Sequence, residues 1–185
     1  MSQNTLQELR PLDEPLLHRL MTDLPLAQMI LRLITSVADL ELTAENVGTD
    51  TGGKKYIFDV QKEDIPVNTD KALSRMADMT AEHWKSISER KNLPAVYLII
   101  FTKEDPFGHG DAVYHFCLLE DSRGEPLTGA DHILYVNGAY ESDDEIGRLL
   151  HDFRCTDPDD MSFKQLADRV RFYKKDPKGV SIINE

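Results

Sequence analysis

Residues 44–61 read AENVGTDTGGKKYIFDVQ, and this stretch decides the fold. The Gly-Gly pair at residues 52–53 lies between two extended runs and predicts the turn of a β-hairpin. After the turn, successive side chains point to opposite faces of a strand. Asp59 and Gln61 therefore share one face, which presents a carboxylate beside a carboxamide. The opposite face carries the apolar residues Tyr56, Phe58 and Val60.

A second carboxylate, Glu45, belongs to the strand that we expect to enter the turn. Two carboxylates on paired strands can converge on a hard cation such as Mg²⁺, which prefers oxygen ligands. Such a cation activates water and neutralises charge on a phosphate. The pattern predicts a metal site formed by Asp59 and Glu45. The ordinary alternative is an acidic and an amide side chain on the solvent face of a half-buried strand.

The length of 185 residues fits a single domain spanning residues 1–185 with a sizeable core. The chain has 33 acidic and 21 basic residues, which give a formal net charge of −12. This charge argues against an avid, sequence-blind binder of nucleic acid, which needs a basic surface. A nuclease is still compatible with it, because an acidic metal site can lie beside a local basic patch.

No apolar run is long enough to span a membrane, and the N-terminal stretch MSQNTLQELRPLDE lacks the apolar segment of a secretory signal. The two cysteines, Cys117 and Cys155, do not form a disulfide framework. We therefore expect a cytoplasmic protein without a membrane partner.

The N-terminal part predicts two helices and a strand. Asp13 can cap a short helix over residues 14–21, and Asp23 or Thr22 can cap the next one. Residues 39–43 alternate like a strand that runs toward Glu45. The second helix has an apolar stripe with helical spacing. Its members are Leu26, Met29, Ile30, Leu33 and Ile34.

A further helix is predicted to begin at Asp70. Its basic residues make it either a phosphate-contacting helix or, given the acidic residues among them, a solvated helix face. The basic residues are Lys71, Arg75, Lys85, Arg90 and Lys91. The expected apolar face consists of Leu73, Met76, Ala77, Thr80, Trp84 and Ile87.

Residues 95–102 (AVYLIIFT) form a continuous apolar run, which is typical of a strand buried on both faces. Further strands are predicted over residues 112–120 and 132–137, with loops between them. A hairpin, a helix and a buried strand in this order indicate an α/β fold. The C-terminal part is predicted to be helical, with Asp143 capping one helix and Asp157 starting another.

Other candidate sites have simpler explanations. His109 lies between two glycines and fits an exposed loop, and His151 and Cys155 share a helix face but lack the further ligands that zinc needs. Helix capping explains the acidic cluster around Asp157, which lacks the spacing of a calcium loop. No phosphate-binding Gly-Lys-Ser/Thr motif occurs.

Several stretches together resemble one bacterial family, the PD-(D/E)XK nuclease family transposases, which are related to recombination-promoting nucleases. They are LPLAQMILRLITSVADLELT, DTGGKKYIFDVQ, LPAVYLIIFTKEDPFGHGDAVYHF and, most specifically, VNGAY and HDFRCTDPDDM near the C-terminus. The resemblance covers most of residues 6–180. It implies a restriction-endonuclease-like core, with a mixed central sheet flanked by helices and a helical C-terminal extension.

The family motif across the hairpin is Asp-x-x-Gly-Lys-Lys-Tyr-x-x-Glu-x-Gln. Here Asp50 and Gln61 match it, as do the residues at 53–56, and Asp59 stands where the family has Glu. The Asp of the preceding strand maps by spacing onto Glu45. The family has a longer segment before the hairpin, so this chain is shortened there.

The resemblance implies a DNA endonuclease that uses Mg²⁺ or Mn²⁺. Asp59 and Glu45 would hold the metal, and Gln61 would place the attacking water. Asp59, Gln61 and Glu45 are thus the predicted catalytic residues, and DNA is the expected partner if the site is active. The shortened segment and the acidic charge favour an alternative, a catalytically inactive relative that acts as a binding or interaction module. A homodimer is a third option.

Overall fold

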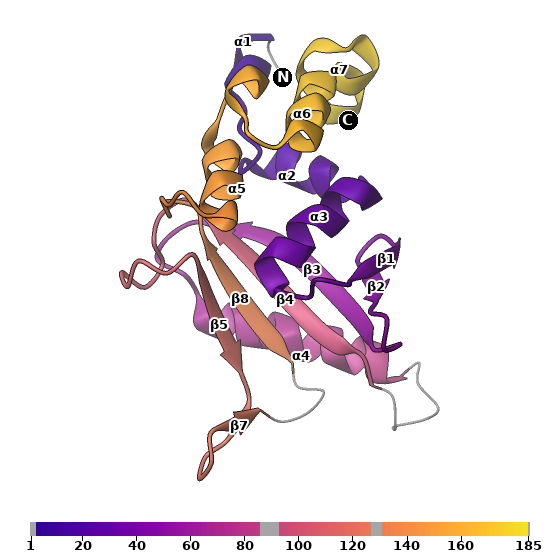
Figure 1. The fold of residues 1–185 in the computed structure, drawn as a ribbon, viewed down its shortest axis with the longest axis vertical. Coiled ribbons are helices and arrows are strands. Elements are labelled where there is room, and N and C mark those ends of the chain that lie inside the picture. The colour runs from indigo at the N-terminus through magenta and orange to yellow at the C-terminus, as the bar shows by residue number, and fades with distance from the viewer. Residues whose placement is uncertain (1–2, 86–92, 127–130, 185) are drawn as a thin grey trace.

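The centre of the fold is a six-stranded mixed sheet. The computed structural model describes residues 3–85, 93–126 and 131–184. The strand order is β1-β2-β3-β4-β8-β5, and β3, β4 and β8 run parallel while the other neighbours are antiparallel (Figure 1). The strands are β1 (Glu41–Ala44), β2 (Val47–Thr49), β3 (Lys55–Glu63), β4 (Ala95–Thr102), β5 (Val113–Cys117) and β8 (His132–Asn137).

Helices flank the sheet on both faces. Helix α4 packs on one face, α3 crosses the other, and the remaining helices gather at one end of the sheet (Figure 1). This confirms the predicted α/β class with a mixed central sheet flanked by helices, and the helical C-terminal part. The helices are α1 (Gln3–Glu8), α2 (Glu14–Met21), α3 (Leu24–Thr35), α4 (Thr69–Lys85), α5 (Glu145–Arg154), α6 (Lys164–Lys175) and α7 (Pro177–Asn184).

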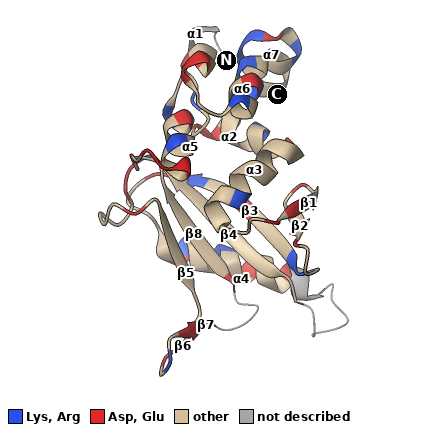
Figure 2. Ribbon diagram, in the orientation of Figure 1, with Lys and Arg blue, Asp and Glu red and all other residues tan. Residues whose placement is uncertain are grey.

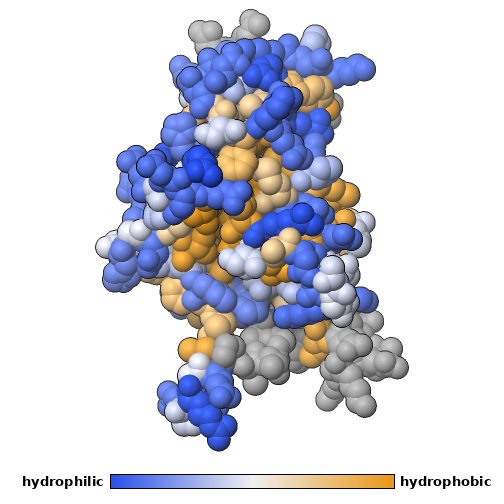
Figure 3. All heavy atoms as spheres, viewed as in Figure 1, coloured by the Kyte–Doolittle hydropathy of each residue, from blue (hydrophilic) through white to orange (hydrophobic). Residues whose placement is uncertain are grey.

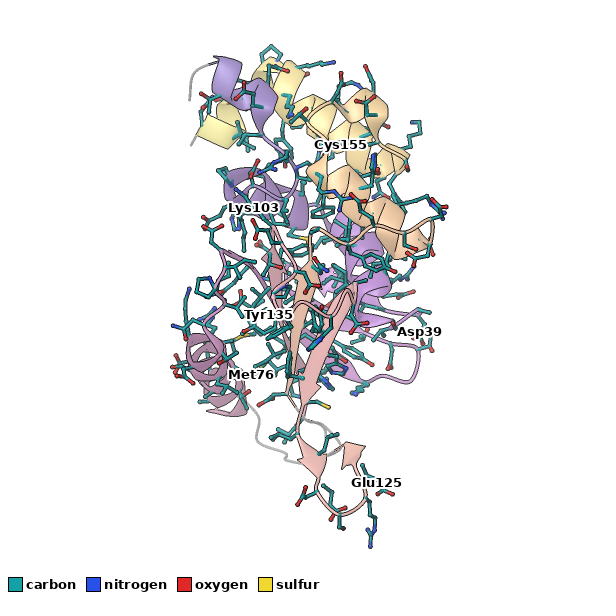
Figure 4. The ribbon with its side chains drawn as sticks, turned by 90° about the vertical axis from the view of Figure 1, so that its left-hand side faces the viewer. Asp39, Met76, Lys103, Glu125, Tyr135 and Cys155 are labelled. Carbon is teal, nitrogen blue, oxygen red and sulfur yellow. The ribbon has the colours of Figure 1, made fainter. Side chains whose placement is uncertain are left out.

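Strand β4 is buried along its whole length, as its continuous apolar sequence predicts. Its alternate side chains enter two separate apolar clusters. The larger cluster includes Tyr97 and Ile99 and lies under α2, α3, α5 and α6. The smaller one includes Leu98 and lies under α4, where Met76 points toward the sheet (Figure 4). Central β4 therefore divides the core into two layers.

The face of α4 that packs on the sheet is displaced from the predicted face by about one residue around the helix axis. Ala72, Met76 and Met79 are buried, whereas Leu73 is 60% exposed and Ala77 is also exposed. The prediction counted Leu73 as a core residue because it is apolar, but the buried positions follow the 72, 76, 79, 80 spacing. The predicted positions Trp84 and Ile87, and the basic residues Lys85, Arg90 and Lys91, have side chains outside the described residues.

Several helices are capped differently from the prediction. Helix α5 begins after Asp144 rather than Asp143, and the Asp144 carboxylate accepts a bond from the Gly147 N–H. Asp157 caps only a 3₁₀ turn over Pro158–Asp160. Asp13 precedes α2 as expected, but its carboxylate binds Arg10 at 3.0 Å instead of capping the helix. Asp23 is the cap of α3, as predicted.

Two segments carry secondary structure that the sequence did not indicate. The predicted strand 112–120 ends at Cys117 in the main sheet, and the expected loop after it contains a small hairpin, β6 (Leu119–Glu120) and β7 (Glu125–Pro126). This hairpin projects beyond the sheet, with Glu125 in the projecting part (Figure 4). The C-terminal helical part also contains a third helix, α7, which begins at Pro177. No helix among the described residues is long and apolar enough to cross a membrane.

Two tyrosines lie opposite each other on β5 and β8 but differ in hydrogen bonding. The Tyr114 hydroxyl donates to Asp105 at 2.6 Å and accepts from the His109 and Asp111 amides. The Asp105 carboxylate in turn accepts three amide N–H groups of the loop that contains His109. Among the described residues, the buried Tyr135 hydroxyl has no hydrogen-bond partner. Tyr114 therefore orders a loop, whereas the Tyr135 hydroxyl is buried without compensation.

The two tyrosines provide a matched test of this arrangement. We expect Tyr135→Phe to leave the free energy of unfolding unchanged or to raise it by about 1 kcal/mol, because it removes an unpaired buried hydroxyl. Tyr114→Phe should lower it by about 1 kcal/mol or more, because Asp105 and two amides lose their partner. Urea unfolding of both variants measures the difference. Equal effects of the two substitutions would contradict these hydrogen-bond assignments.

Candidate functional site

The predicted residues Asp59 and Gln61 lie together on β3, on the face covered by α4. Alternation along the strand puts Tyr56 and Phe58 into the larger apolar cluster and leaves Asp59 and Gln61 half-buried on the other side, as predicted. The Gln61 side-chain amide donates to Asp59 Oδ2 at 2.7 Å. The carboxylate and the carboxamide therefore form one polar unit.

Helix α4 brings a cation to the same carboxylate. Arg75 Nε lies 2.8 Å from Asp59 Oδ2, the oxygen that Gln61 also contacts. This hydrogen bond and the negative charge of Asp59 raise the pKa of Arg75. One helical turn earlier, Lys71 lies 3.6 Å from Glu63, which shares the β3 face with Asp59. Two exposed cations of α4 thus face the acidic side of β3.

Glu45 lies in a different place from the one expected. It belongs to the two-residue turn between β1 and β2, next to Asn46, which has a positive φ of 63°. The prediction placed Glu45 on a strand because residues 39–49 read as one extended run. The structure divides this run into two short paired strands, with a register shift near the turn. Glu45 is exposed at the tip of this turn.

The turn that contains Glu45 nevertheless makes a backbone contact with β3 next to Asp59. Val47 pairs with Ile57, and the pairing continues as the Phe58 N–H donates to the Asn46 carbonyl at 2.9 Å. Glu45 precedes Asn46 in the turn and Asp59 follows Phe58 on β3, so each flanks this hydrogen bond. The structure therefore brings Asp59 and Gln61 into contact, whereas Glu45 lies in the exposed turn that precedes β2.

The hairpin that sets this register is held by Asp50. Its carboxylate accepts bonds from the Lys54 N–H at 2.9 Å and from the Tyr56 hydroxyl at 2.8 Å. These two bonds lower the pKa of Asp50. Gly53 adopts a φ of 80°, which glycine accepts without strain. The turn signal at residues 52–53 is confirmed.

Close packing at Gly48 fixes the other half of the hairpin. A Cβ atom at this position would lie 2.7 Å from Leu40 Cδ1 and 2.9 Å from the Glu41 carbonyl oxygen. A side chain here would therefore push β1 away from β2. Glycine at this position keeps Glu45 in its tight turn.

Two groups of three potential metal ligands occur among the described residues, and neither contains Asp59 or Glu45. Both groups combine nitrogen, sulfur or carboxylate donors within 4.8 Å of one another. Sequence reasoning noted only His151 and Cys155 and missed the other group entirely. The groups are His115, Cys117 and His132, and His151, Asp152 and Cys155.

The first group was detectable in principle. His115 and Cys117 are two apart on a strand and so point to one face, but the third member is distant in the sequence. Burial lowers the pKa of His132 to about 4, with smaller contributions from nearby His115 and Lys54. The imidazole of His132 is therefore neutral near pH 7.

The remaining sequence candidates have structural explanations. His109 lies in an exposed loop, as expected. Asp159 pairs with Arg171 at 2.6 Å, and this ion pair lowers the pKa of Asp159. Asp157 accepts the Asp159 N–H in the 3₁₀ turn. These acidic residues therefore stabilise a turn and a helix contact.

Comparison with known proteins provides no relative. No protein family, curated protein or solved structure matches this chain. The residues of the site and their geometry therefore carry the functional argument.

The hairpin should respond to pH through Asp50. Because its folded-state pKa is lowered, Asp50 contributes stability above its ordinary pKa, and this stability is lost as pH falls below that value. We expect Asp50→Asn to weaken amide protection at Lys54 and Phe58 at neutral pH and to reduce the acid-induced loss seen in the wild type. Hydrogen exchange followed by NMR from pH 7 to pH 3 measures both effects. Unchanged protection in the variant would show that Asp50 does not hold the turn.

Proposed function

We propose that this protein is a metal-dependent hydrolase of DNA phosphodiester bonds. In this proposal Asp59 and Glu45 hold Mg²⁺ or Mn²⁺, and Gln61 places the attacking water. The observation that carries it is the contact of Gln61 with the Asp59 carboxylate on β3, beside the turn that holds Glu45, where the residue after Glu45 is hydrogen-bonded to the residue before Asp59. Both residues flank one backbone hydrogen bond, so we expect the exposed Glu45 side chain to reach a cation bound by Asp59.

The order of elements supports this function. A helix, three antiparallel strands, a second helix and a parallel strand follow one another as α3, β1–β3, α4 and β4. We infer that this arrangement is the restriction-endonuclease-like core implied by the sequence resemblance. The resemblance implies that one acidic residue comes from the strand before the hairpin turn and the other from the strand after it. Asp59 lies in the middle of β3, and Glu45 lies in the β1–β2 turn just before β2.

Metal binding would rearrange the contacts of Asp59. Arg75 and Gln61 both bind Oδ2, so a cation could take the other oxygen or displace the guanidinium. The ion pair is weak enough for this exchange, because the Arg75 side chain is 48% exposed. Mg²⁺ retains several waters when few protein ligands are present. Gln61 can accept a hydrogen bond from one of them and orient it.

Local positive charge would help to bind the phosphate. Lys71 and Arg75 on α4 face the acidic side of β3. Acidic and basic residues are otherwise spread over the elements of a chain that is acidic as a whole (Figure 2). Cations near a phosphodiester stabilise the charge that develops during hydrolysis. With so few cations, we expect weak binding of DNA with a shallow dependence on salt, because few counterions are released.

A second function is favoured by the ion pair itself. Arg75 already neutralises Asp59 at the position where a cation would bind. A net charge of −12 also opposes association with a polyanion. We infer as the alternative a catalytically inactive module that retains the fold for binding or interaction. In that case the polar unit of Asp59, Gln61 and Arg75 would connect β3 to α4.

Cleavage of supercoiled plasmid DNA in the presence of Mg²⁺ or Mn²⁺ tests the proposal. We expect nicking by the wild type that chelation abolishes. Asp59→Asn should reduce the rate of nicking by at least about a hundredfold, because substitutions of residues that merely support metal ligands can already reduce activity by that factor. Asp121→Asn, which changes an exposed acid outside the site, is the matched control and should retain full activity.

Arg75→Met separates the two functions. If Asp59 is a metal ligand, removing its competing cation should lower the Mn²⁺ concentration needed for half-maximal nicking. Absence of cleavage by both the folded wild type and Arg75→Met would exclude the nuclease and support the binding module. Cleavage by Asp59→Asn at the wild-type rate would exclude the proposed site and support the same alternative.

A further inference from the structure

Three soft or borderline metal ligands meet at one edge of the sheet. His115 and Cys117 project from edge strand β5, and His132 begins β8. The His115 Nε2 and His132 Nδ1 atoms lie 2.8 Å apart, and the Cys117 sulfur lies within 4.8 Å of both rings' ligand atoms. None of these residues belongs to the proposed phosphodiesterase site.

Strand pairing creates this cluster. Cys117 lies directly opposite His132, and His115 is two residues before Cys117 on the same face. That face is the one that carries Val136 and Tyr97 of the larger apolar cluster, opposite α4. The three side chains therefore converge from two adjacent strands. All three residues lie on strands and none on a loop, which makes their geometry rigid.

Packing orients one of the ligands in advance. The His132 ring stacks on buried Tyr97, with ring centroids 4.4 Å apart and an interplanar angle of 17°. The His115 ring lies 5.0 Å from the His132 ring, and Cys117 is partly accessible and free of any disulfide. A half-buried ring with a fixed orientation, beside an exposed imidazole and a partly accessible thiol, is suited to capture an ion from solvent.

We propose that His115, Cys117 and His132 bind a transition-metal ion of the zinc class. Imidazole nitrogen and thiolate sulfur are the ligands that Zn²⁺ and Co²⁺ prefer over the oxygen ligands of Mg²⁺. Bonds of about 2.0–2.3 Å in a tetrahedron place neighbouring ligand atoms roughly 3.3–3.7 Å apart. The observed cluster needs only small side-chain adjustments to reach this geometry. Three protein ligands leave a fourth position for water or an external ligand.

Binding exchanges protons in a defined way. The close contact of the two rings is a hydrogen bond, so one of its nitrogens carries a proton. That ring moves its proton to its other nitrogen and remains neutral, and the Cys117 thiol loses its proton to solvent. One metal ion therefore replaces one shared hydrogen bond and releases one proton.

The surrounding charges limit the affinity. Lys54 is close enough to His132 to act on it electrostatically and opposes a second cation. The Cys117 thiolate adds the compensating negative charge. A bound ion would join edge strand β5 to β8 just before the projecting hairpin β6–β7. Apolar atoms are exposed where this hairpin begins, including those of Phe116, Leu118 and Leu119 (Figure 3).

The second group of ligands does not provide an equivalent site. Asp152 is fully buried, and its two oxygens accept the N–H groups of Ser162 and Phe163 at 2.9 and 2.7 Å. These bonds hold the segment that leads into α6. Recruiting Asp152 to a metal would break them, so His151 and Cys155 lack a third available ligand. Cys155 is therefore a built-in control for Cys117.

Titration of the metal-free full-length protein with Co²⁺ tests the proposal. We expect one equivalent to produce intense thiolate-to-cobalt charge-transfer absorption and the visible bands of tetrahedral cobalt, and Zn²⁺ to abolish both by displacement. Cys117→Ser should remove the charge-transfer band. His115→Gln should weaken cobalt binding by about a hundredfold or more, because substitutions of residues that merely support metal ligands can already weaken metal affinity by up to that factor. Cys155→Ser should leave the spectrum unchanged.

A readout from the thiols complements the spectrum. Zn²⁺ should protect Cys117, but not Cys155, from alkylation as measured by mass spectrometry. Asp59→Asn should leave cobalt binding intact, which distinguishes this site from the proposed phosphodiesterase site. The proposal is overturned if no equivalent of Co²⁺ binds, if Cys117→Ser retains the charge-transfer band, or if Cys155→Ser removes it.

Discussion

The pairing of β3 with β4 is the constraint on which the rest of the structure depends. Eight consecutive residue pairs join the two parallel strands, from Tyr56 with Ala95 to Glu63 with Thr102. Since β4 is buried on both faces, β3 must present its aromatic residues to one apolar layer. A shift of one residue would bury Asp59 and Gln61 in that layer, at the cost of an unpaired charge. Burial therefore fixes which side chains face α4.

This constraint extends outward in both directions across the sheet. On one side, β3 positions the β2 strand and, through the Phe58–Asn46 hydrogen bond, the turn that holds Glu45. On the other side, β4 positions β8 and so His132, which stacks on Tyr97 of β4. The two proposed metal sites thus lie on opposite faces of one sheet and depend on the same central strands. Their ligands differ in kind, with oxygen donors on the α4 face and nitrogen and sulfur donors on the other.

Local sequence patterns predicted much of this arrangement. The Gly-Gly turn, the alternation after it and the buried strand 95–102 are local signals, and each was confirmed. Apolar character predicted burial less reliably, because tertiary packing decides which side chains are buried. Leu73, for example, is apolar but faces solvent. The turn at Glu45 was missed because its positive φ is carried by Asn46 rather than glycine. The ion pair of Arg75 with Asp59 and the cluster at His132 join residues distant in sequence, and no local pattern indicates them.

The central claim is that Glu45 and Asp59 hold one divalent cation despite the presence of Arg75. A crystal soaked in Mn²⁺ and measured at a wavelength with manganese anomalous scattering tests this claim directly. The account predicts an anomalous peak between the Glu45 and Asp59 carboxylates, with the Arg75 guanidinium displaced from Oδ2. Retention of the 2.8 Å Arg75–Asp59 contact with no manganese beside it would contradict the claim.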